Sequence, residues 1–129
     1  YYPLIAKYLD GATASGLYEA KLAAEEMCNK EVVDIDGKTK VCENHIFSPA
    51  YPEKDIDEIL DICDHLVFNS FTQWEKYKDK ALAAKKECGL RINPECSTQD
   101  HAIYDPCSPG SRLGVTLANF KPPILQHLI

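Results

Sequence analysis

Two patterns of apolar and polar positions alternate along the chain. Short apolar runs, typical of buried strands, are each followed by a stretch in which apolar residues recur every three or four positions, typical of amphipathic helices. This repeat predicts a parallel sheet flanked by helices, and therefore an α/β fold. The predicted strands are residues 12–15, 45–48, 65–70 and 89–94. The predicted helices are residues 1–9, 16–29, 55–63 and 72–87, and a further helix is expected to begin near Pro123.

The helix at 16–29 has the clearest start. Ser15 stands directly before it, where a side-chain oxygen can cap the free amides of the first turn. Glu19 falls within that turn, where the helix dipole favours an acid. The apolar positions predicted for the three longer helices are Leu17, Ala20, Leu22, Ala24 and Met27, then Ile56, Ile59, Leu60 and Cys63, then Trp74, Tyr77, Leu82 and Ala84.

Residues 31–43 interrupt the alternation of strand and helix. Two short stretches at 32–35 and 38–41 flank the pair Asp36-Gly37. Asp-Gly is a preferred pair for a type I′ turn between two antiparallel strands. We therefore predict a β-hairpin inserted at the surface, with its lysines in water.

The spacing of the strands narrows the architecture. Four strand–helix units in 129 residues give about 32 residues per unit, which matches a (β/α)₈ barrel of roughly 250 residues. The chain would then hold about four units, or half, of such a barrel. An open, doubly wound sheet has the same alternation and stays possible from periodicity alone.

Each predicted strand ends in polar residues: Ser15, Ser48, Asn69 with Ser70, and Asn93. In parallel barrels the carboxyl ends of the strands meet at one mouth, and the side chains there carry the chemistry. Serine and asparagine are also common helix caps and loop residues, so each one alone supports either interpretation. Four polar strand ends in succession favour a polar pocket mouth.

Composition and charge exclude several classes of function. The net charge is −6 and the lysines are scattered among acidic residues, which argues against a nucleic-acid interface because that needs a basic stripe. The chain has no run of about 18 apolar residues that would predict a membrane span. It opens without a signal peptide and without an initiator Met, so we expect a cytoplasmic segment that starts inside a longer protein.

The chain has six cysteines, at positions 28, 42, 63, 88, 96 and 107. No two have the C-x-x-C spacing of a zinc ribbon, so we expect no metal site. Several fall on apolar faces of the predicted helices and strands. We therefore expect reduced, mostly buried thiols, although six cysteines could also serve a secreted disulfide scaffold.

Six segments, taken in order and spacing, resemble a known family. They are residues 8–19 (YLDGATASGLYE), 46–51 (IFSPAY), 66–70 (LVFNS), 90–94 (LRINP), 104–107 (YDPC) and 111–114 (SRLG). The set resembles the carboxynorspermidine (carboxyspermidine) decarboxylases, alanine racemase-like enzymes of fold type III that depend on pyridoxal 5'-phosphate. The resemblance covers nearly the whole chain apart from the hairpin at 31–43.

The resemblance implies that the chain is part of a longer subunit, and that two such subunits form a homodimer. The implied reaction is decarboxylation of carboxynorspermidine or carboxyspermidine to norspermidine or spermidine, with pyridoxal 5'-phosphate as cofactor. Residues 1–129 would be part of an N-terminal PLP-binding TIM barrel. The first strand with the Schiff-base lysine, the second half of the barrel and a C-terminal β-domain would lie outside them. We therefore expect no catalytic residue in this segment and no activity from it alone.

The resemblance also suggests which residues contact the cofactor. Arg91 is the first candidate, for the phenolic oxygen of the pyridine ring, because a guanidinium stays charged and donates in a fixed fork. Arg112 is the second, and either arginine could instead form an ion pair or brace a loop. Glu19 could orient an arginine, but we favour a role at the helix start. Ser15 and Asn69 could line the pocket floor or be ordinary loop residues.

Two other functions stay open. The segment could be a non-catalytic half-barrel that binds pyridoxal phosphate or another phosphate ligand, or an inactive structural fragment. A half-barrel also leaves two open sheet edges, which favour association between chains. We therefore predict that the segment alone is unstable or self-associates.

Overall fold

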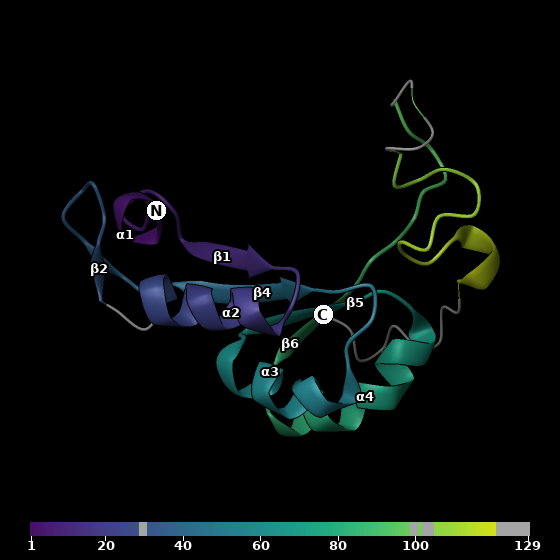
Figure 1. Ribbon diagram of the computed structural model, residues 1–129, viewed down its shortest axis with the longest axis horizontal. Coiled ribbons are helices and arrows are strands. Elements are labelled where there is room, and N and C mark those ends of the chain that lie inside the picture. Colours follow the sequence, from purple (N-terminus) through teal and green to yellow (C-terminus); the bar gives the residue numbers. More distant parts are fainter. Residues whose placement is uncertain (29–30, 99–100, 102–104, 121–129) are drawn as a thin grey trace.

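The chain forms a parallel sheet of four strands. The computed structural model describes residues 1–28, 31–98, 101 and 105–120. The strands pair in the order β1-β4-β5-β6 (Figure 1). Thr13 pairs with His45, His45 with His65, and His65 with Glu87, so these residues form one row across the sheet. The strands are β1 (Gly11–Ala14), β4 (Glu43–Phe47), β5 (His65–Phe68) and β6 (Glu87–Leu90). The predicted α/β class and four parallel strands are confirmed.

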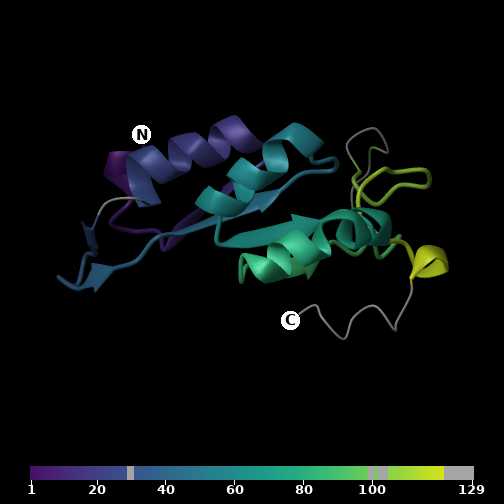
Figure 2. The same ribbon diagram turned by 90° about the horizontal axis from the view of Figure 1, so that it is seen from below.

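Three helices cover one face of this sheet. They lie below the strands in Figure 1, and Figure 2 looks onto this helical layer. Because side chains alternate along a strand, every second residue faces the helices, and Ile46, Leu66 and Phe68 are fully buried there. The three helices are α2 (Leu17–Ala23), α3 (Ile56–Ile62) and α4 (Phe71–Ala83). Shorter elements are α1 (Tyr2–Ile5), a π turn (Ala24–Cys28) and 3-10 turns at Glu53–Asp55 and Leu117–Asn119.

Aromatic residues fill the core between sheet and helices. The predicted packing role of Trp74 is confirmed, because it is fully buried with its ring 5.5 Å from that of Phe68. The buried Tyr51 hydroxyl donates toward two carbonyls, Val67 O at 2.8 Å and Ile46 O at 3.1 Å. Burial raises the pKa of Tyr51 well above its usual range. Tyr51 therefore braces neighbouring strands β4 and β5 from the helical side.

Some predicted core positions on the helices are wrong. Leu22 and Leu82 are 49% and 46% exposed, and Ala84 is exposed as well. Ala23 and Ala81 are buried in their place. In both helices the buried stripe therefore lies one position away from the leucine.

Helix α4 ends earlier than predicted. It stops at Ala83 rather than at residue 87, because Lys85 adopts a left-handed backbone conformation with φ of 55°. The N–H groups of Lys85 and Lys86 then donate to the carbonyls of Leu82 and Ala81, both at 3.0 Å. This turn closes the helix and sends the chain directly into β6.

The inserted hairpin is present, but its turn differs from the predicted type I′. Strands β2 (Val32–Val33) and β3 (Thr39–Lys40) pair antiparallel. Gly37 has φ of 81°, whereas Asp36 does not have the positive φ that a type I′ turn needs at both central positions. The Asp34 N–H donates to Lys38 O at 2.9 Å, which closes a three-residue loop.

One hairpin lysine is also not fully in water as predicted. The Lys40 side chain is 14% exposed, and its Nζ lies 3.4 Å from Asp10 Oδ1 just before β1. The stem of Lys40 therefore covers apolar surface while its charge reaches a carboxylate. Lys38 is exposed, as expected.

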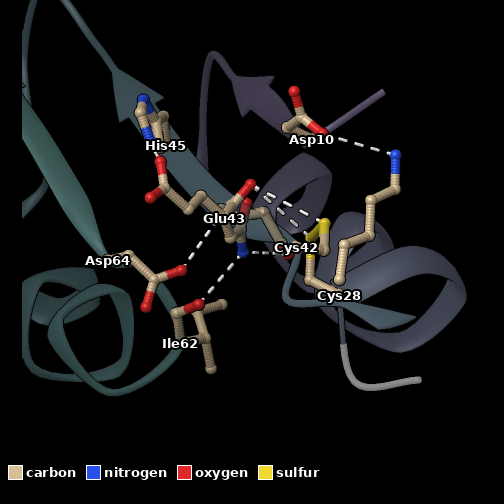
Figure 3. Close-up of a disulfide and its surroundings, with 10 residues drawn as sticks. Asp10, Cys28, Cys42, Glu43, His45, Ile62 and Asp64 are labelled. Atoms are coloured by element: carbon tan, nitrogen blue, oxygen red, sulfur yellow. Dashed lines mark hydrogen bonds and ion pairs between the residues drawn. A yellow bond between two sulfur atoms is a disulfide. The ribbon is translucent and has the colours of Figure 1, made fainter. Parts of the chain in front are cut away.

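The expectation of six reduced thiols is wrong for two cysteines. Cys28 and Cys42 form a disulfide across the base of the hairpin, between the end of the π turn and the residue before β4 (Figure 3). Cys42 packs there with Met27 and Ala6 in a small second core. The remaining four cysteines are free: Cys63 and Cys88 are buried as predicted, whereas Cys96 is exposed and Cys107 half-buried.

Three further predictions concern the ends of elements. The helix predicted over 16–29 continues beyond α2 as the π turn that ends at Cys28, and residue 29 lies outside the described residues. The helix predicted near Pro123 also lies outside them. Among the helices that the structure describes, none has the length and apolar character needed to cross a membrane.

Candidate functional site

The face of the sheet opposite the helices carries a second set of side chains. Along β4, His45 and Phe47 alternate with residues buried under the helices and are half-exposed, and Val67 of β5 repeats the pattern. No element within the described residues packs over this face as the helices do on the other. The carboxyl ends of the four strands therefore open onto an accessible surface, where the sequence predicted a polar pocket mouth.

Arg91 follows β6 and reaches across this face. Its guanidinium carbon lies 4.7 Å from the centre of the Phe47 ring, which belongs to the strand beyond the neighbouring one. The Arg91 N–H donates to Phe68 O at 2.8 Å, so strand pairing continues past the end of β6. In the described part of the chain Arg91 has no carboxylate partner. Stacking holds the guanidinium, and its N–H groups stay available for an anion.

Asn69, directly after β5, binds the loop that carries Arg112. Its Nδ2 donates to Arg112 O at 2.8 Å, and its Oδ1 accepts from the Gly114 N–H at 2.7 Å. The Asn69 N–H in turn donates to Gln73 Oε1 at 2.7 Å. The Arg112 side chain itself is exposed. The structure therefore brings Asn69, Arg91 and the backbone of Arg112 to the same edge of the sheet.

Gly114 allows the same loop to lie against the end of β6. The Val115 N–H donates to Arg91 O, and the Asn93 N–H donates to Val115 O, both at 2.8 Å. Gly114 has φ of 82°, and a Cβ at this position would stand 2.9 Å from Asn93 N and 3.2 Å from Arg91 Cγ. A side chain there would meet backbone that has no room to move, so this close approach requires glycine.

A hollow lies between this loop and the start of α4. Ser70 caps the helix, because its Oγ accepts from the Gln73 N–H at 3.2 Å. The hollow has a volume of about 220 Å³ and is lined by Ser70, Phe71, Thr72, Gly114, Val115 and Asn119. The first turn of α4 therefore borders open space at the carboxyl edge of the sheet.

Ser15 and Glu19 bind each other rather than an arginine. The N–H and Oγ of Ser15 donate to one Glu19 carboxylate oxygen, at 2.7 and 2.6 Å. These bonds lower the pKa of Glu19. The N-cap of α2 is Gly16 and not Ser15 as predicted, since the Ser15 hydroxyl is committed to Glu19. The favoured interpretation of Glu19, stabilisation of the helix start, is supported by this geometry.

The other polar strand ends serve local turns. Ser48 Oγ donates to Ala50 O at 3.0 Å, and Asn93 Oδ1 accepts from the Glu95 N–H at 2.9 Å. Asn93 is also 4% exposed, so it faces no open pocket. For these two residues the structure favours the loop-residue interpretation over a pocket mouth.

The partners of the two arginines carry no functional signal in the sequence. Phe47 reads only as part of a strand, and Gly114 only as part of the S-R-L-G segment. Alternation could have placed Phe47 on the uncovered face, because it stands two residues after His45 on β4. Nothing local in the sequence points to the contact between Asn69 and Gly114, which are 45 residues apart.

A row of ionisable groups lies on the same face nearer the amino ends of the strands. His45 Nε2 lies 2.8 Å from Glu43 Oε2, and His65 Nδ1 lies 3.6 Å from Glu87 Oε2. The two imidazole rings are 4.9 Å apart. Each imidazole therefore lies beside a carboxylate of the same strand or of the neighbouring strand.

The fold and the site together define a class of protein. This is an α/β chain whose parallel strands present an arginine, an asparagine and a glycine-containing loop at their carboxyl ends. Such ends are where parallel α/β sheets bind ligands. No family model matches the chain.

Comparison with individual known proteins shows which of them this chain resembles. Over 117 residues, 91% of this chain, it is 40% identical to a carboxyaminopropylagmatine decarboxylase of Synechocystis sp.. Over 118 residues, 92% of this chain, it is 39% identical to a carboxynorspermidine/carboxyspermidine decarboxylase of Campylobacter jejuni. The crystal structure of carboxynorspermidine decarboxylase from Campylobacter jejuni, complexed with norspermidine, matches 98% of this chain with a TM-score of 0.70 and 32% identity.

These matches confirm the resemblance read from the six sequence segments. The chain is homologous to a segment of the carboxynorspermidine decarboxylases. It spans 27% of the length of each of the two curated relatives and 28% of the solved chain. The matched part thus amounts to about a quarter of a whole subunit of these relatives.

Proposed function

We propose that this chain is part of the N-terminal barrel of a pyridoxal 5'-phosphate-dependent decarboxylase that acts on a carboxylated polyamine. The observation that carries the proposal is the 39–40% identity to such decarboxylases over about nine-tenths of the chain. Four parallel strands with helices on one face are about half of what an eight-stranded barrel contains. In this proposal the rest of the barrel and a C-terminal β-domain belong to the remainder of the subunit, and two subunits form a homodimer.

The residues at the carboxyl edge fit the non-covalent part of a cofactor site. The four strands of the sheet contain no lysine, so the lysine that bonds to the cofactor lies on another strand of the proposed subunit. Arg91 suits an anionic oxygen of the cofactor, because its guanidinium is held by Phe47 and has no carboxylate partner among the described residues. Pyridoxal phosphate, when bound, supplies the conjugated ring that accepts the electron pair left by departing carbon dioxide.

The other candidate residues take different parts in the proposed site. Arg112 presents a second guanidinium from an exposed position on the loop that Asn69 holds. Ser15 and Glu19 order the turn between β1 and α2 at the same edge of the sheet. The two arginines are therefore the groups from this segment that we propose to contact the cofactor directly.

The substrate is proposed from the names of the relatives. The Campylobacter jejuni protein is named for carboxynorspermidine and carboxyspermidine, and the Synechocystis protein for carboxyaminopropylagmatine. All three are carboxylated and carry several amino or guanidino groups. We propose that the whole subunit converts carboxynorspermidine or carboxyspermidine to norspermidine or spermidine, with the agmatine derivative as the competing substrate to test.

Carbon dioxide release tests this function. A complete subunit that includes residues 1–129 would be assayed with each of the three carboxylated substrates, with and without added pyridoxal phosphate. We expect cofactor-dependent release from at least one substrate, and none from the 129-residue chain alone. Absence of release from all three substrates, or release that does not depend on the cofactor, would contradict the proposal.

A further inference from the structure

Asn69 connects the two arginines of the proposed cofactor site through the backbone. Its side-chain amide binds Arg112 O and the Gly114 N–H at 2.8 and 2.7 Å. One residue further on, the Val115 N–H donates to Arg91 O at 2.8 Å. The loop at 111–115 is therefore fastened to the end of β5 by Asn69 and to the end of β6 by Arg91.

The orientation of the Asn69 amide follows from its partners. Arg112 offers a carbonyl, which can only accept, and Gly114 offers an N–H, which can only donate. A flipped amide would face donor with donor and acceptor with acceptor, so the assignment is unambiguous. The backbone of Asn69 is held separately, because its N–H donates to Gln73 Oε1.

These bonds change the interpretation of Asn69. The sequence predicted that it could line the floor of a cofactor pocket, but its amide uses a donor and its acceptor on the loop backbone. The position of that backbone determines where the exposed Arg112 side chain begins.

We propose that Asn69 is a positioning residue, which acts on the cofactor through Arg112 and does not bind the cofactor itself. This inference rests on the proposed function, since it assigns Arg112 to an anionic group of pyridoxal phosphate. We call the two bonds from the Asn69 amide to Arg112 O and the Gly114 N–H the clamp. The clamp holds Arg112 in position relative to Arg91 before the anionic cofactor arrives, so that less ordering is needed on binding.

The clamp can be tested in a complete subunit with variants of Asn69. Asn69→Leu removes both bonds, whereas Asn69→Asp keeps an acceptor for Gly114 and loses the donor to Arg112. Asp34→Leu is the matched control, because it also removes two side-chain bonds to the backbone, from the Asp36 and Lys38 N–H groups at 2.8 and 2.9 Å, but in the hairpin. We expect Asn69→Leu to speed hydrogen exchange of Gly114 and Val115 and to weaken pyridoxal phosphate binding, each about tenfold, and the control to change neither.

A double-variant cycle separates positioning from general stability. Arg112→Met should weaken binding of pyridoxal phosphate about tenfold by removing the cation. Adding Asn69→Leu to Arg112→Met should weaken binding no further, because Arg112, the cation that Asn69 positions, is already absent. A purely structural Asn69 would give multiplied losses, about a hundredfold in the double variant, and would overturn the proposal. If Asn69→Leu fails to fold, Asn69→Asp takes its place in the same cycle.

The failure of the clamp and the failure of the proposed function give different results. A wild-type subunit that binds no pyridoxal phosphate would refute the proposed function, and the positioning role with it. Normal binding by the wild type, with unchanged exchange of Gly114 and Val115 in Asn69→Leu, would refute the clamp alone. Normal binding of pyridoxal phosphate by the wild type, together with a double variant that binds no more weakly than Arg112→Met alone, supports both the proposed function and the clamp.

Discussion

Reducing the Cys28–Cys42 disulfide should destabilise the chain by about 3 kcal/mol. The bond joins residues 14 apart, and closing a loop of about this length removes about 3 kcal/mol of conformational entropy from the unfolded chain. Reduction breaks the covalent bond without removing side-chain atoms from the core, as substitution by a smaller residue would. Cys42 is only 5% exposed, and after reduction its side chain still packs beside Met27. The loss therefore reflects the missing covalent link (Figure 3).

Tryptophan fluorescence during urea unfolding measures this loss. The chain has one tryptophan, Trp74, which is fully buried against Phe68 and will report on the core. With a slope of about 2 kcal/mol per molar urea, a loss of 3 kcal/mol moves the midpoint by about 1.5 M. The same chain would be compared with and without a dithiol reductant.

Two outcomes would refute the reasoning. One is the same midpoint in both conditions. The other is the reaction of all six cysteines with a thiol reagent in urea before reduction, where four are expected from the free cysteines Cys63, Cys88, Cys96 and Cys107. The control is the double variant Cys28→Ala, Cys42→Ala, whose midpoint should be lower than that of the oxidised chain and unaffected by reductant.

Three further predictions follow from the packing. Tyr51→Phe leaves the carbonyls of Ile46 and Val67 without their side-chain donor and should cost about 1–2 kcal/mol in the same urea assay, whereas an unchanged midpoint would contradict the brace. Burial raises the pKa of the Cys63 and Cys88 thiols from 9.0 to about 11. The unfolded chain therefore loses these protons first, and stability should fall as pH rises from about 9 to 11. The double variant Cys63→Ala, Cys88→Ala should show a smaller fall over this window, and an equal fall would contradict the assignment. The segment alone should self-associate through the free edge of β1 and its uncovered sheet face, as sedimentation velocity would show, and a monomer at all concentrations would contradict this.

The strands could be predicted because their signal is local. Residues 65–68 form an apolar run before a polar end, and the structure makes them β5 with Leu66 and Phe68 buried. The same local logic found β1 and β4 to within two residues at each end, whereas β6 begins two residues earlier and ends four residues earlier than predicted. The helices were also found, because Ile56, Ile59 and Leu60 repeat at helical spacing and are buried.

Features that depend on distant contacts could not be predicted in this way. The early end of α4 depends on the left-handed backbone conformation of Lys85. Non-glycine residues rarely adopt this conformation, so the sequence does not predict it there. The disulfide depends on the hairpin bringing Cys28 beside Cys42. At the candidate site, Arg91 is a candidate because of a family resemblance, but its stacking on Phe47 arises only when β4, β5 and β6 are side by side.

The affinity of a complete subunit for pyridoxal phosphate, measured with Arg91 replaced, tests the central claim most directly. Arg91→Met removes the charge at similar length, Arg91→Lys keeps a charge without the fork, and Lys38→Met removes an exposed cation from the hairpin that precedes the amino end of β4. The account predicts a loss of about tenfold for Arg91→Met, a smaller loss for Arg91→Lys and none for Lys38→Met. Equal affinity in the wild type and both Arg91 variants would contradict the claim that these strand ends hold the cofactor.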